Sequence, residues 1–477
     1  KTAYEISLGL VGSEMCIRDS NTRRDIIMAL LDHYGFGLPT GNAEAAEAYD
    51  KGARSFVAWR ADAMDHLNAA IAADGNFTLP CILKAWILHG GRAARFDPII
   101  DKLLSSVEPL LGGAGERERA FAEALRVGHN GNLQAGAAIL EAHLAEEPAD
   151  LIAHRLFQFE LFWSGESKWM RDVVERAAPI WNDKSPDFGH FQAVRAFSNE
   201  ESGDYATAER VGREAVECEP NSAWGAHSIA HVLLMQGRVE EGVEWLEGLC
   251  QNWDAANQIK HHCWWHLCLF LLELGEHDRI LNLLETQVRN PESPLVQAVP
   301  DATIDLQNVA ALLMRLELRG VDVGERWQSI AKICAGRTND HANPFASAHD
   351  AMVLAAVDEF TLIDELLASM RVHGSDKTST VSNVTRSLGI PLVKAILAHR
   401  KGEHDYVVDL LWPIRRSFSQ LGGSHAQRDV FFQILVHSAI QANRSSQLSI
   451  LLDDIAGMGF ESVSERTLYK DAAALAA

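Results

Sequence analysis

Apolar and polar positions along this chain form helical runs that come in pairs, and each pair is joined by a glycine-centred polar turn. Gly203-Asp204-Tyr205 marks one such turn and Gly237-Arg238-Val239 the next, and the tetrapeptide Gly-Glu-His-Asp occurs at both 275–278 and 402–405. Similar turns at intervals of about thirty to forty-five residues indicate stacked helix–turn–helix units, each too small to bury its apolar face without its neighbours.

The clearest unit extends from 189 to 220. Small residues stand at positions 8, 20 and 27 of a 34-residue repeat and a proline at position 32, namely Ala196, Ala208, Ala215 and Pro220. This is the tetratricopeptide pattern, in which small residues allow two helices to cross closely and the proline ends the second helix. The segment 117–148 repeats it with Ala124, Gly136 and Pro148. Later turns are less regularly spaced, so we expect insertions in some repeats.

The pattern predicts an all-α protein, an α-α superhelix built as a tetratricopeptide-like helical-hairpin solenoid. It predicts helix pairs at 78–108, 117–147, 151–178, 189–218, 223–251, 261–289, 302–335, 345–372, 388–419 and 425–457, with an earlier helix at about 43–73. No stretch alternates as a strand would. We expect an N-terminal helical region, 21–110, that continues into repeats over 117–470. The segments 290–300 and 372–383 are predicted to be long loops, in the first place plain surface connections, with a lid over the groove as the alternative.

The first twenty residues, Lys1–Ser20, fit none of this repeat pattern. They begin without Met and read KTAYEISLGLVGSEMCIRDS, which looks like a translated sequencing-adaptor tail. Their apolar stretch is too short for the core of a secretory signal and has the wrong flanks. We therefore interpret 1–20 as a non-native tail and leave it out of the fold.

Composition and charge narrow the classes of partner. With 47% hydrophobic and 23% charged residues, the chain can bury a large core. Its net charge of −22 repels a phosphate backbone, so we predict no nucleic-acid partner. The longest apolar runs, such as 263–272, are too short to span a bilayer, so we predict no membrane association. The seven cysteines are scattered without a C-x-x-C pair, which favours a reducing, cytoplasmic location.

Four segments carry a resemblance to a known family: Gly189–Gln192, Ala226–Arg238, His262–Gly275 and Gly423–Asp429. Together they resemble the tetratricopeptide repeat protein 38 family, and the resemblance covers nearly all of residues 22 to 470. It implies an all-helical repeat protein of soluble compartments, found in bacteria and in animals. The resemblance supplies no activity.

Histidines provide the candidate chemistry. His227 and His231 are four residues apart on the first helix of one unit, and His262 and His266 are four apart on the first helix of the next, so each pair shares one helix face. In tetratricopeptide stacks the first helices line the inner, concave surface. The predicted groove-binding set also contains His190, Arg195, Asp305, His349, Asp350, His425, Arg428 and Asp429. Such a surface suits a polar or anionic ligand.

Three interpretations of these histidines stay open. They could line a groove, or they could pack among tryptophans and make one hydrogen bond each, because Trp224, Trp264 and Trp265 are their neighbours in sequence. The spacing of four is also that of zinc-binding pairs on helices, and Asp305 or Asp429 could complete the shell. The chain has no H-E-x-x-H sequence, and we assign neither a metal nor a cofactor.

Other catalytic signatures are incomplete. The stretch 422–426 approaches a nucleophile elbow but ends in alanine and lacks the preceding strand, so Ser424 is better explained as a helix N-cap. The leading hypothesis is a binding protein that holds a peptide, a protein segment or a polar small molecule in a His-rich concave groove. The alternative is a hydrolase-type enzyme that uses groove His and Asp residues, with or without a metal. The third hypothesis is a structural subunit of an assembly. Whether the chain is an enzyme stays open.

Overall fold

The computed structural model describes residues 30–461 and 463–476, so the predicted tail 1–20 lies outside the described residues. Within the described part the chain forms 25 α-helices and no strand, with isolated β-bridges only at Leu31–Gly37 and Arg60–Ala256. The predicted all-α class is confirmed. In the same residues, no helix combines the length and the apolar character needed to cross a bilayer.

The helices follow the chain in tandem. Those of the first half are α1 Ala43–Val57, α2 Ala63–Ala73, α3 Thr78–Gly90, α4 Asp97–Val107, α5 Glu116–His129, α6 Leu133–Glu146, α7 Leu151–Ser164, α8 Ser167–Ala177, α9 Phe188–Glu201, α10 Tyr205–Cys218, α11 Ala223–Met235 and α12 Val239–Leu249. Those of the second half are α13 Ile259–Glu273, α14 His277–Leu283, α15 Pro294–Ala298, α16 Thr303–Glu317, α17 Gln328–Ala335, α18 Pro344–Ala356, α19 Phe360–His373, α20 Thr380–Val384, α21 Ile390–Arg400, α22 His404–Leu411, α23 His425–Gln441, α24 Ser445–Ala456 and α25 Thr467–Ala476.

The ten predicted helix pairs are confirmed to within a few residues at most ends, but three other predictions are wrong. The predicted connection 372–383 contains most of the short helix α20. The predicted single helix at 43–73 is a hairpin, α1 and α2, because Trp59 has a positive φ of 57° and Arg60 bridges to Ala256 far along the chain. The predicted connection 290–300 contains the short helix α15, which places Pro294 in its first turn, where a missing N–H costs nothing.

First and second helices of a hairpin differ in burial. All 13 residues of α11 are buried, whereas its partner α12 buries only Gly242 and Leu246. A helix that is apolar around its whole circumference belongs inside a protein, and one with a single apolar stripe belongs at its surface. The first helices therefore form the inner layer of the superhelix and the second helices its outer layer.

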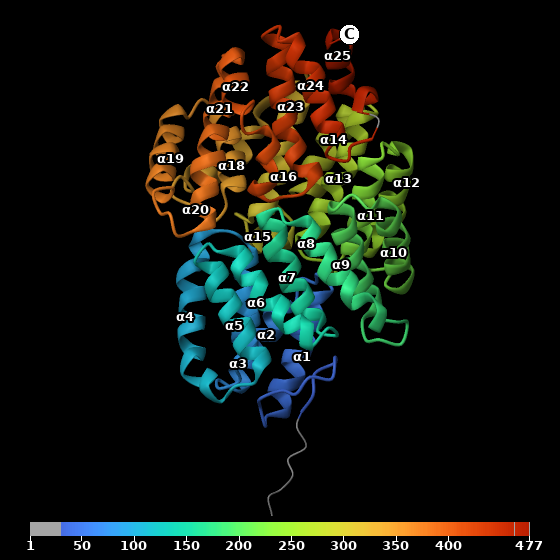
Figure 1. Ribbon diagram of the computed structural model, residues 1–477, viewed down its shortest axis with the longest axis vertical. Coiled ribbons are helices and arrows are strands. Elements are labelled where there is room, and N and C mark those ends of the chain that lie inside the picture. Colours follow the sequence, from blue (N-terminus) through green and yellow to red (C-terminus); the bar gives the residue numbers. More distant parts are fainter. Residues whose placement is uncertain (1–29, 462, 477) are drawn as a thin grey trace, which may run out of the picture.

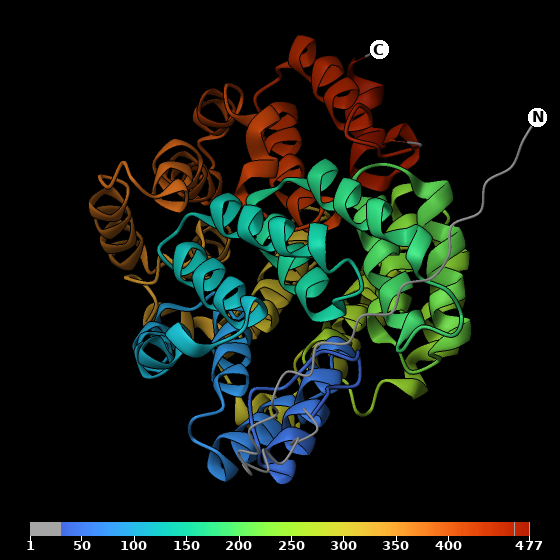
Figure 2. The ribbon, with the colours of Figure 1, turned by 60° about the horizontal axis from the view of Figure 1, so that its bottom comes forward.

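The helical hairpins of the second half of the chain stack on those of the first half. In Figure 1, α1–α6 lie in the lower half, α9–α12 on the right and α21–α25 in the upper half; Figure 2 shows the blue-to-green hairpins following one another around a turn that the orange and red hairpins continue. Hydrogen bonds join the two turns, such as Thr380 Oγ1 to Gly131 O at 2.6 Å and Tyr205 OH to Gly459 O at 2.9 Å. These partners are 249 and 254 positions apart.

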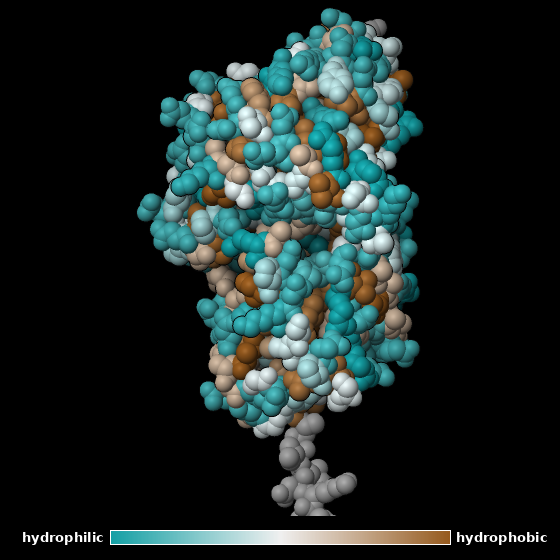
Figure 3. Space-filling model, turned by 90° about the vertical axis from the view of Figure 1, so that its left-hand side faces the viewer, coloured by the Kyte–Doolittle hydropathy of each residue, from teal (hydrophilic) through white to brown (hydrophobic). Residues whose placement is uncertain are grey.

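Stacking of the turns encloses the inner face. The segment after α1 contacts the segment before α13, where Asn257 N donates to Trp59 O at 2.8 Å. The end of α13 contacts the start of α25, where Thr467 N donates to Glu273 Oε2 at 2.9 Å. Figure 3 shows one outer face, where hydrophilic and hydrophobic residues are mixed and a hollow lies at mid-height. That face has no broad apolar patch of the kind an assembly subunit presents.

The crossing of α9 and α10 gives a test of the repeat register. Ala208 on α10 is fully buried where these two helices pack, whereas Ala206 on the same helix is exposed. Replacing Ala208 by Leu should lower the free energy of unfolding by about 1 to 3 kcal/mol, because the added carbons have no space at the crossing. Ala206→Leu is the control and should change it little. Chemical denaturation of both variants checks this, and equal midpoints would mean that the register is wrong.

Candidate functional site

A cavity of about 640 Å³ lies along the axis of the superhelix. Its walls come from the first helices α3, α7, α9, α11, α13 and α16, together with the segment between α1 and α2. Arg60 and Asp65, which are exposed, line one end, so the cavity reaches solvent there. Leu295 and Val299, in and just after α15, line the same cavity. The connection 290–300 thus borders the cavity.

One wall of the cavity is aromatic. The rings of Trp59 and Trp224 stack with centroids 4.6 Å apart and an interplanar angle of 25°. The ring of Phe197 also packs against Trp224, with the two ring centroids 4.6 Å apart. The indole Nε1 atoms of both tryptophans are buried and have no acceptor in the protein, and the same is true of Gln307 Nε2. The wall therefore combines apolar rings with donors that lack acceptors.

Arg155 is the central polar group of this wall. It lies on α7 with 1% of its surface exposed, and its guanidinium carbon is 4.5 Å from the ring centre of Trp59 and 5.1 Å from that of Trp224. Nη1 donates to Gln158 Oε1 at 2.9 Å, whereas Nε and Nη2 have no partner. Burial lowers the pKa of Arg155 to about 9. Within the described residues no carboxylate forms an ion pair with it.

Gln158 holds Arg155 in position. Its Nε2 donates to Val194 O at 2.9 Å and to Ser198 Oγ at 3.0 Å on α9, so its Oε1 is left to accept from the guanidinium. The two remaining donor atoms of Arg155, Nε and Nη2, are thereby held in position where water does not reach them. Burying a charge without a partner costs free energy of folding, so the arrangement indicates that a bound group supplies the partner.

A second charged group in the cavity is already neutralised. Glu160 Oε1 accepts from Arg92 Nη2 at 2.8 Å and lies 2.9 Å from His89 Nε2. Burial raises the pKa of Glu160, but His89 and Arg92 outweigh burial and lower it overall. Burial lowers the pKa of His89 to about 4, with Arg92 acting in the same direction. Since Arg92 balances Glu160, the positive charge of Arg155 is left over.

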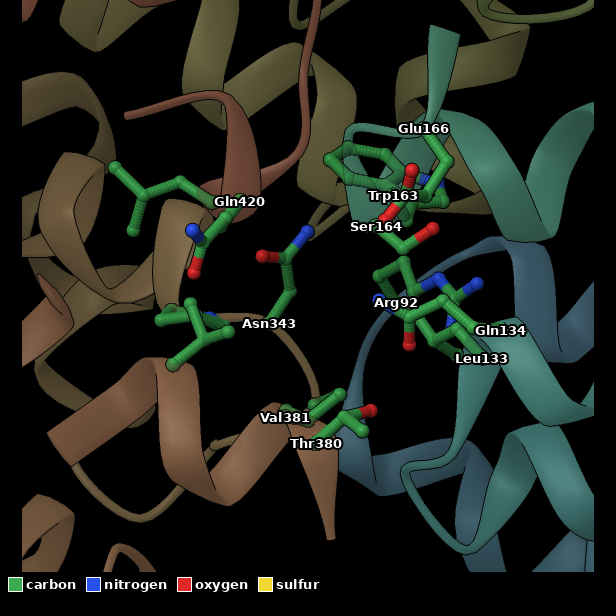
Figure 4. A pocket seen from close by; sticks show the side chains of 14 residues that line it. Arg92, Leu133, Gln134, Trp163, Ser164, Glu166, Asn343, Thr380, Val381 and Gln420 are labelled. Atoms are coloured by element: carbon green, nitrogen blue, oxygen red, sulfur yellow. The ribbon is translucent and has the colours of Figure 1, made fainter. Parts of the chain in front are cut away.

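A smaller cavity of about 150 Å³ lies where the two turns meet. In Figure 4, Arg92, Gln134 and Trp163 come from the first turn on one side, and Asn343 and Thr380 from the second turn on the other. Arg92 and Trp163 line both cavities. We see this space as part of the junction between the turns, because it is too small for most organic ligands.

The two predicted histidine pairs come together beside the main cavity. We call this group the four-histidine cluster: His227 and His231 of α11, His262 and His266 of α13. One ring nitrogen from each lies within 4.8 Å of the others. Exposure of the four side chains is 0 to 3%. His227 and His262 line the cavity, and His231 and His266 lie behind them.

The hydrogen bonds of the cluster are incomplete. His227 Nε2 and His231 Nε2 are 3.0 Å apart, and His262 Nδ1 is 2.7 Å from Asn308 Oδ1 of α16. Neither nitrogen of His266 has a partner in the protein. Leaving a buried polar group unsatisfied costs about 1 to 3 kcal/mol. Burial lowers the pKa of all four imidazoles, of His231 to about 4 and of His262 to about 3, so they are neutral at pH 7.

Two buried carboxylates of α9 adjoin the cluster. Glu200 Oε2 is 3.3 Å from His231 Nδ1, and Glu201 Oε1 is 3.8 Å from the same atom. Burial raises the pKa of Glu200 to about 8 and that of Glu201 to about 7. Neither oxygen of Glu200 has a hydrogen-bond partner. Arg428 Nη2 lies 3.7 Å from Glu201, which brings two further predicted residues, Arg428 and His425, to the edge of this region.

The other predicted site residues lie apart from the cluster and have local partners. Arg195 forms a two-point ion pair with Glu175, at 2.7 and 2.8 Å, and Asp350 is paired with Arg337 at 3.1 Å. His349 Nδ1 donates to a backbone carbonyl, Asp305 is 3.0 Å from His261, Asp429 accepts from Tyr469 and Gln433, and His190 is half-buried on α9.

Burial changes the interpretation of the predicted groove. Nine of the twelve residues are buried, and His190, Arg195 and His425 are half-buried. The inner face is therefore an enclosed space and not an open channel, because the second turn of the superhelix covers the first. Ser424 is the N-cap of α23 in a capping box with Gln427, which confirms its predicted role.

Sequence reasoning missed Arg155, Glu160 and Trp59. A signal for the first two is present: the helix 151–164 reads LIAHRLFQFELFWS, in which Arg155 and Glu160 are the two charged residues of a mainly apolar run. A charge within a helix that is apolar on all sides must be buried and needs a partner. Trp59 has no comparable signal, since it lies in a break between helices.

No family model matches the chain. Human IFIT1 dimer with PPP-AAAA is 12% identical with a TM-score of 0.41, covering 94% of this chain and 98% of that one. Human IFIT1 dimer with m7Gppp-AAAA is 13% identical with a TM-score of 0.36, and the match covers 94% of this chain and 97% of that one. Yeast Tom70 is 13% identical with a TM-score of 0.33, and the match covers 91% of this chain and 94% of that one. Similarity this low leaves the ligand and the activity of the present chain open.

Proposed function

We propose that this protein binds a small organic anion in the axial cavity, with the anionic group on Arg155 and an apolar or aromatic body against Trp59 and Trp224. The observation that carries the proposal is the buried guanidinium whose Nε and Nη2 have no partner. A carboxylate accepts from two guanidinium donors at once, with a geometry that these two atoms match.

The neighbouring donors support an anion. Trp59 Nε1, Trp224 Nε1 and Gln307 Nε2 line the same cavity and have no acceptor in the protein. A ligand rich in acceptor oxygens would satisfy several of them together, and an uncharged hydrocarbon would satisfy none. The leftover charge of Arg155 also selects against cations.

Size and enclosure favour a small molecule over the peptide or protein segment that the sequence also allowed. A volume of about 640 Å³ falls within the range of about 300 to 1,000 Å³ that is usual for pockets of small ligands. An extended peptide needs a groove in which its main chain can continue past both ends. We therefore choose the small molecule among the three ligand classes.

We also propose membership of the tetratricopeptide repeat protein 38 family and a cytoplasmic location. The first rests on the segments 189–192, 226–238, 262–275 and 423–429, and the second on the cysteine pattern, with the six described cysteines free. Neither supplies a ligand. Both are independent of the cavity.

Binding can be tested with the full chain and matched pairs of probes. We expect 3-phenylpropionate and indole-3-acetate to raise the unfolding temperature, and their uncharged amides to have little effect, because only the acids neutralise Arg155. At a concentration of one hundred times Kd, binding adds about 2.7 kcal/mol to stability. Mass analysis of molecules released on denaturation would identify a natural ligand. Equal shifts with acid and amide, or no shift with any acid, would contradict the proposal.

A further inference from the structure

We propose that His227, His231, His262 and His266 together bind one divalent transition-metal ion of the zinc class, each through one ring nitrogen. The site goes beyond the anion proposed for the cavity and does not depend on it. It uses neutral imidazole ligands, which suit zinc, copper and nickel better than the hard cations calcium and magnesium.

Helix geometry brings the four rings to one point. Each pair is spaced by four residues on one face, and α11 and α13 pack against each other as successive inner helices. Five of the six ring pairs have centroids 4.4 to 5.1 Å apart. A tetrahedral ion with bonds of about 2.0 Å needs its nitrogens about 3.3 Å apart. His227 Nε2 and His231 Nε2, at 3.0 Å, already meet this separation, and the other rings must close inwards.

A neighbouring amide orients one of the ligands, and a carboxyl group lies beside another. His262 Nδ1 donates to Asn308 Oδ1 at 2.7 Å, which leaves the lone pair of its Nε2 free. His231 Nδ1 lies 3.3 Å from Glu200 Oε2 but makes no hydrogen bond to it, and its Nε2 is 3.0 Å from His227 Nε2. A metal-binding histidine commonly donates its other N–H to a carboxylate or a carbonyl oxygen, which fixes the ring and strengthens the ligand.

Packing alone does not explain His266. A histidine kept in a core for packing usually makes at least one hydrogen bond, yet both ring nitrogens of His266 are buried without a partner and three other imidazoles surround it. Imidazole lone pairs that face one another repel, and a shared cation removes that repulsion. The unpartnered nitrogen thereby becomes a ligand.

Two buried acidic side chains lie next to the cluster. Glu200 is fully buried with no hydrogen-bond partner on either oxygen, and Glu201 has a single distant cation, Arg428 at 3.7 Å. A dication held by His231 places positive charge one ring away from both carboxylates. His227 and His262 line the axial cavity, which gives the ion a path from solvent. Since four protein ligands fill a tetrahedral shell, the ion would tie α11 to α13 and have no open position for water.

The test is metal analysis of tag-free, full-length protein with zinc(II) and cobalt(II) as probes. We expect about one zinc ion per chain, a tetrahedral cobalt(II) absorption spectrum, and X-ray absorption that shows nitrogen ligands at about 2.0 Å. His231→Gln and His266→Phe, which nearly preserve side-chain volume, should each lower zinc affinity at least tenfold. Neither side chain lines the cavity, so carboxylate binding should remain, and Arg155→Met should keep its zinc.

A second histidine group in the chain serves as the matched control. His399, His404 and His437 also bring ring nitrogens within 4.8 Å, but they are half-buried and lie in the C-terminal helices. His437→Gln should leave zinc stoichiometry unchanged. Loss of zinc in His437→Gln but not in His266→Phe would overturn the proposal, as would sulfur or oxygen ligands in the absorption spectrum, or wild-type protein that takes up no zinc or cobalt. If the variants unfold, the wild-type absorption spectrum alone decides.

Discussion

Replacing Arg155 by methionine is expected to abolish carboxylate binding and to leave the ligand-free protein at least as stable as before. Removing one partner of a buried charge pair costs about 2 to 5 kcal/mol of binding free energy, which is a loss of about thirtyfold or more. Without ligand, the guanidinium is a buried charge with no ion-pair partner, and methionine fills a similar volume without that charge. Titration calorimetry with 3-phenylpropionate and chemical denaturation measure the two effects.

Arg315 on α16 is the matched control. It is equally buried, at 1% exposure, and lies over the ring of Trp265 at 5.4 Å, but it has acceptors: Ala426 O at 2.7 Å and Ala311 O at 3.2 Å. Arg315→Met should lower stability by about 1 to 3 kcal/mol, because two hydrogen bonds from a charged donor are lost, and should leave carboxylate affinity unchanged. If Arg155→Met behaves like Arg315→Met in both measurements, Arg155 is a packing residue.

Replacing Gly165 by alanine is expected to lower the free energy of unfolding by about 3 kcal/mol or more. Gly165 follows α7 with φ at 75°, and a Cβ built on it lies 2.0 Å from the carbonyl oxygen of Ser419 in the other turn of the superhelix. The left-handed conformation costs a non-glycine residue about 1 to 2 kcal/mol, and the two backbones must also separate.

Gly203 provides the control for the contact itself. Its φ is 88° and an added Cβ has nothing within 4 Å, so Gly203→Ala carries the conformational cost alone. The difference between the two variants in urea unfolding measures how much the close approach of the two turns contributes. Equal losses in both variants would show that the approach at Ser419 contributes nothing to stability.

The hairpins could be predicted from sequence because their signals are local. The pair expected at 223–251 is α11 and α12 at 223–249, since a serine N-cap, a glycine turn at 237 and an apolar first helix all lie within the segment. The break at Trp59 could not be predicted. It has no glycine or proline, and the contact that stabilises it is with Ala256, almost two hundred residues away.

In the candidate site, too, features with a local sequence signal could be predicted and those that depend on distant contacts could not. The four histidines were expected on one surface because their spacing and their place on successive first helices are local properties, and they do converge. Whether they line a groove or bind a metal remains a prediction. Enclosure of that surface depends on contacts such as that between Gly131 and Thr380, for which no local signal exists. Asp350 and Arg195 have ion-pair partners that residue type alone could not reveal.

The closing of one turn over the other has a consequence for how the protein is made. Gly131 bonds to Thr380, which is 249 positions later, and at about 5 to 20 residues per second the ribosome needs about 12 to 50 s to supply it. For that time the emerging first turn has formed hairpins but no cover. Arg155, Glu200 and the histidines are then open to the surrounding solution, so ligand and metal can be acquired during synthesis, before the second turn covers them.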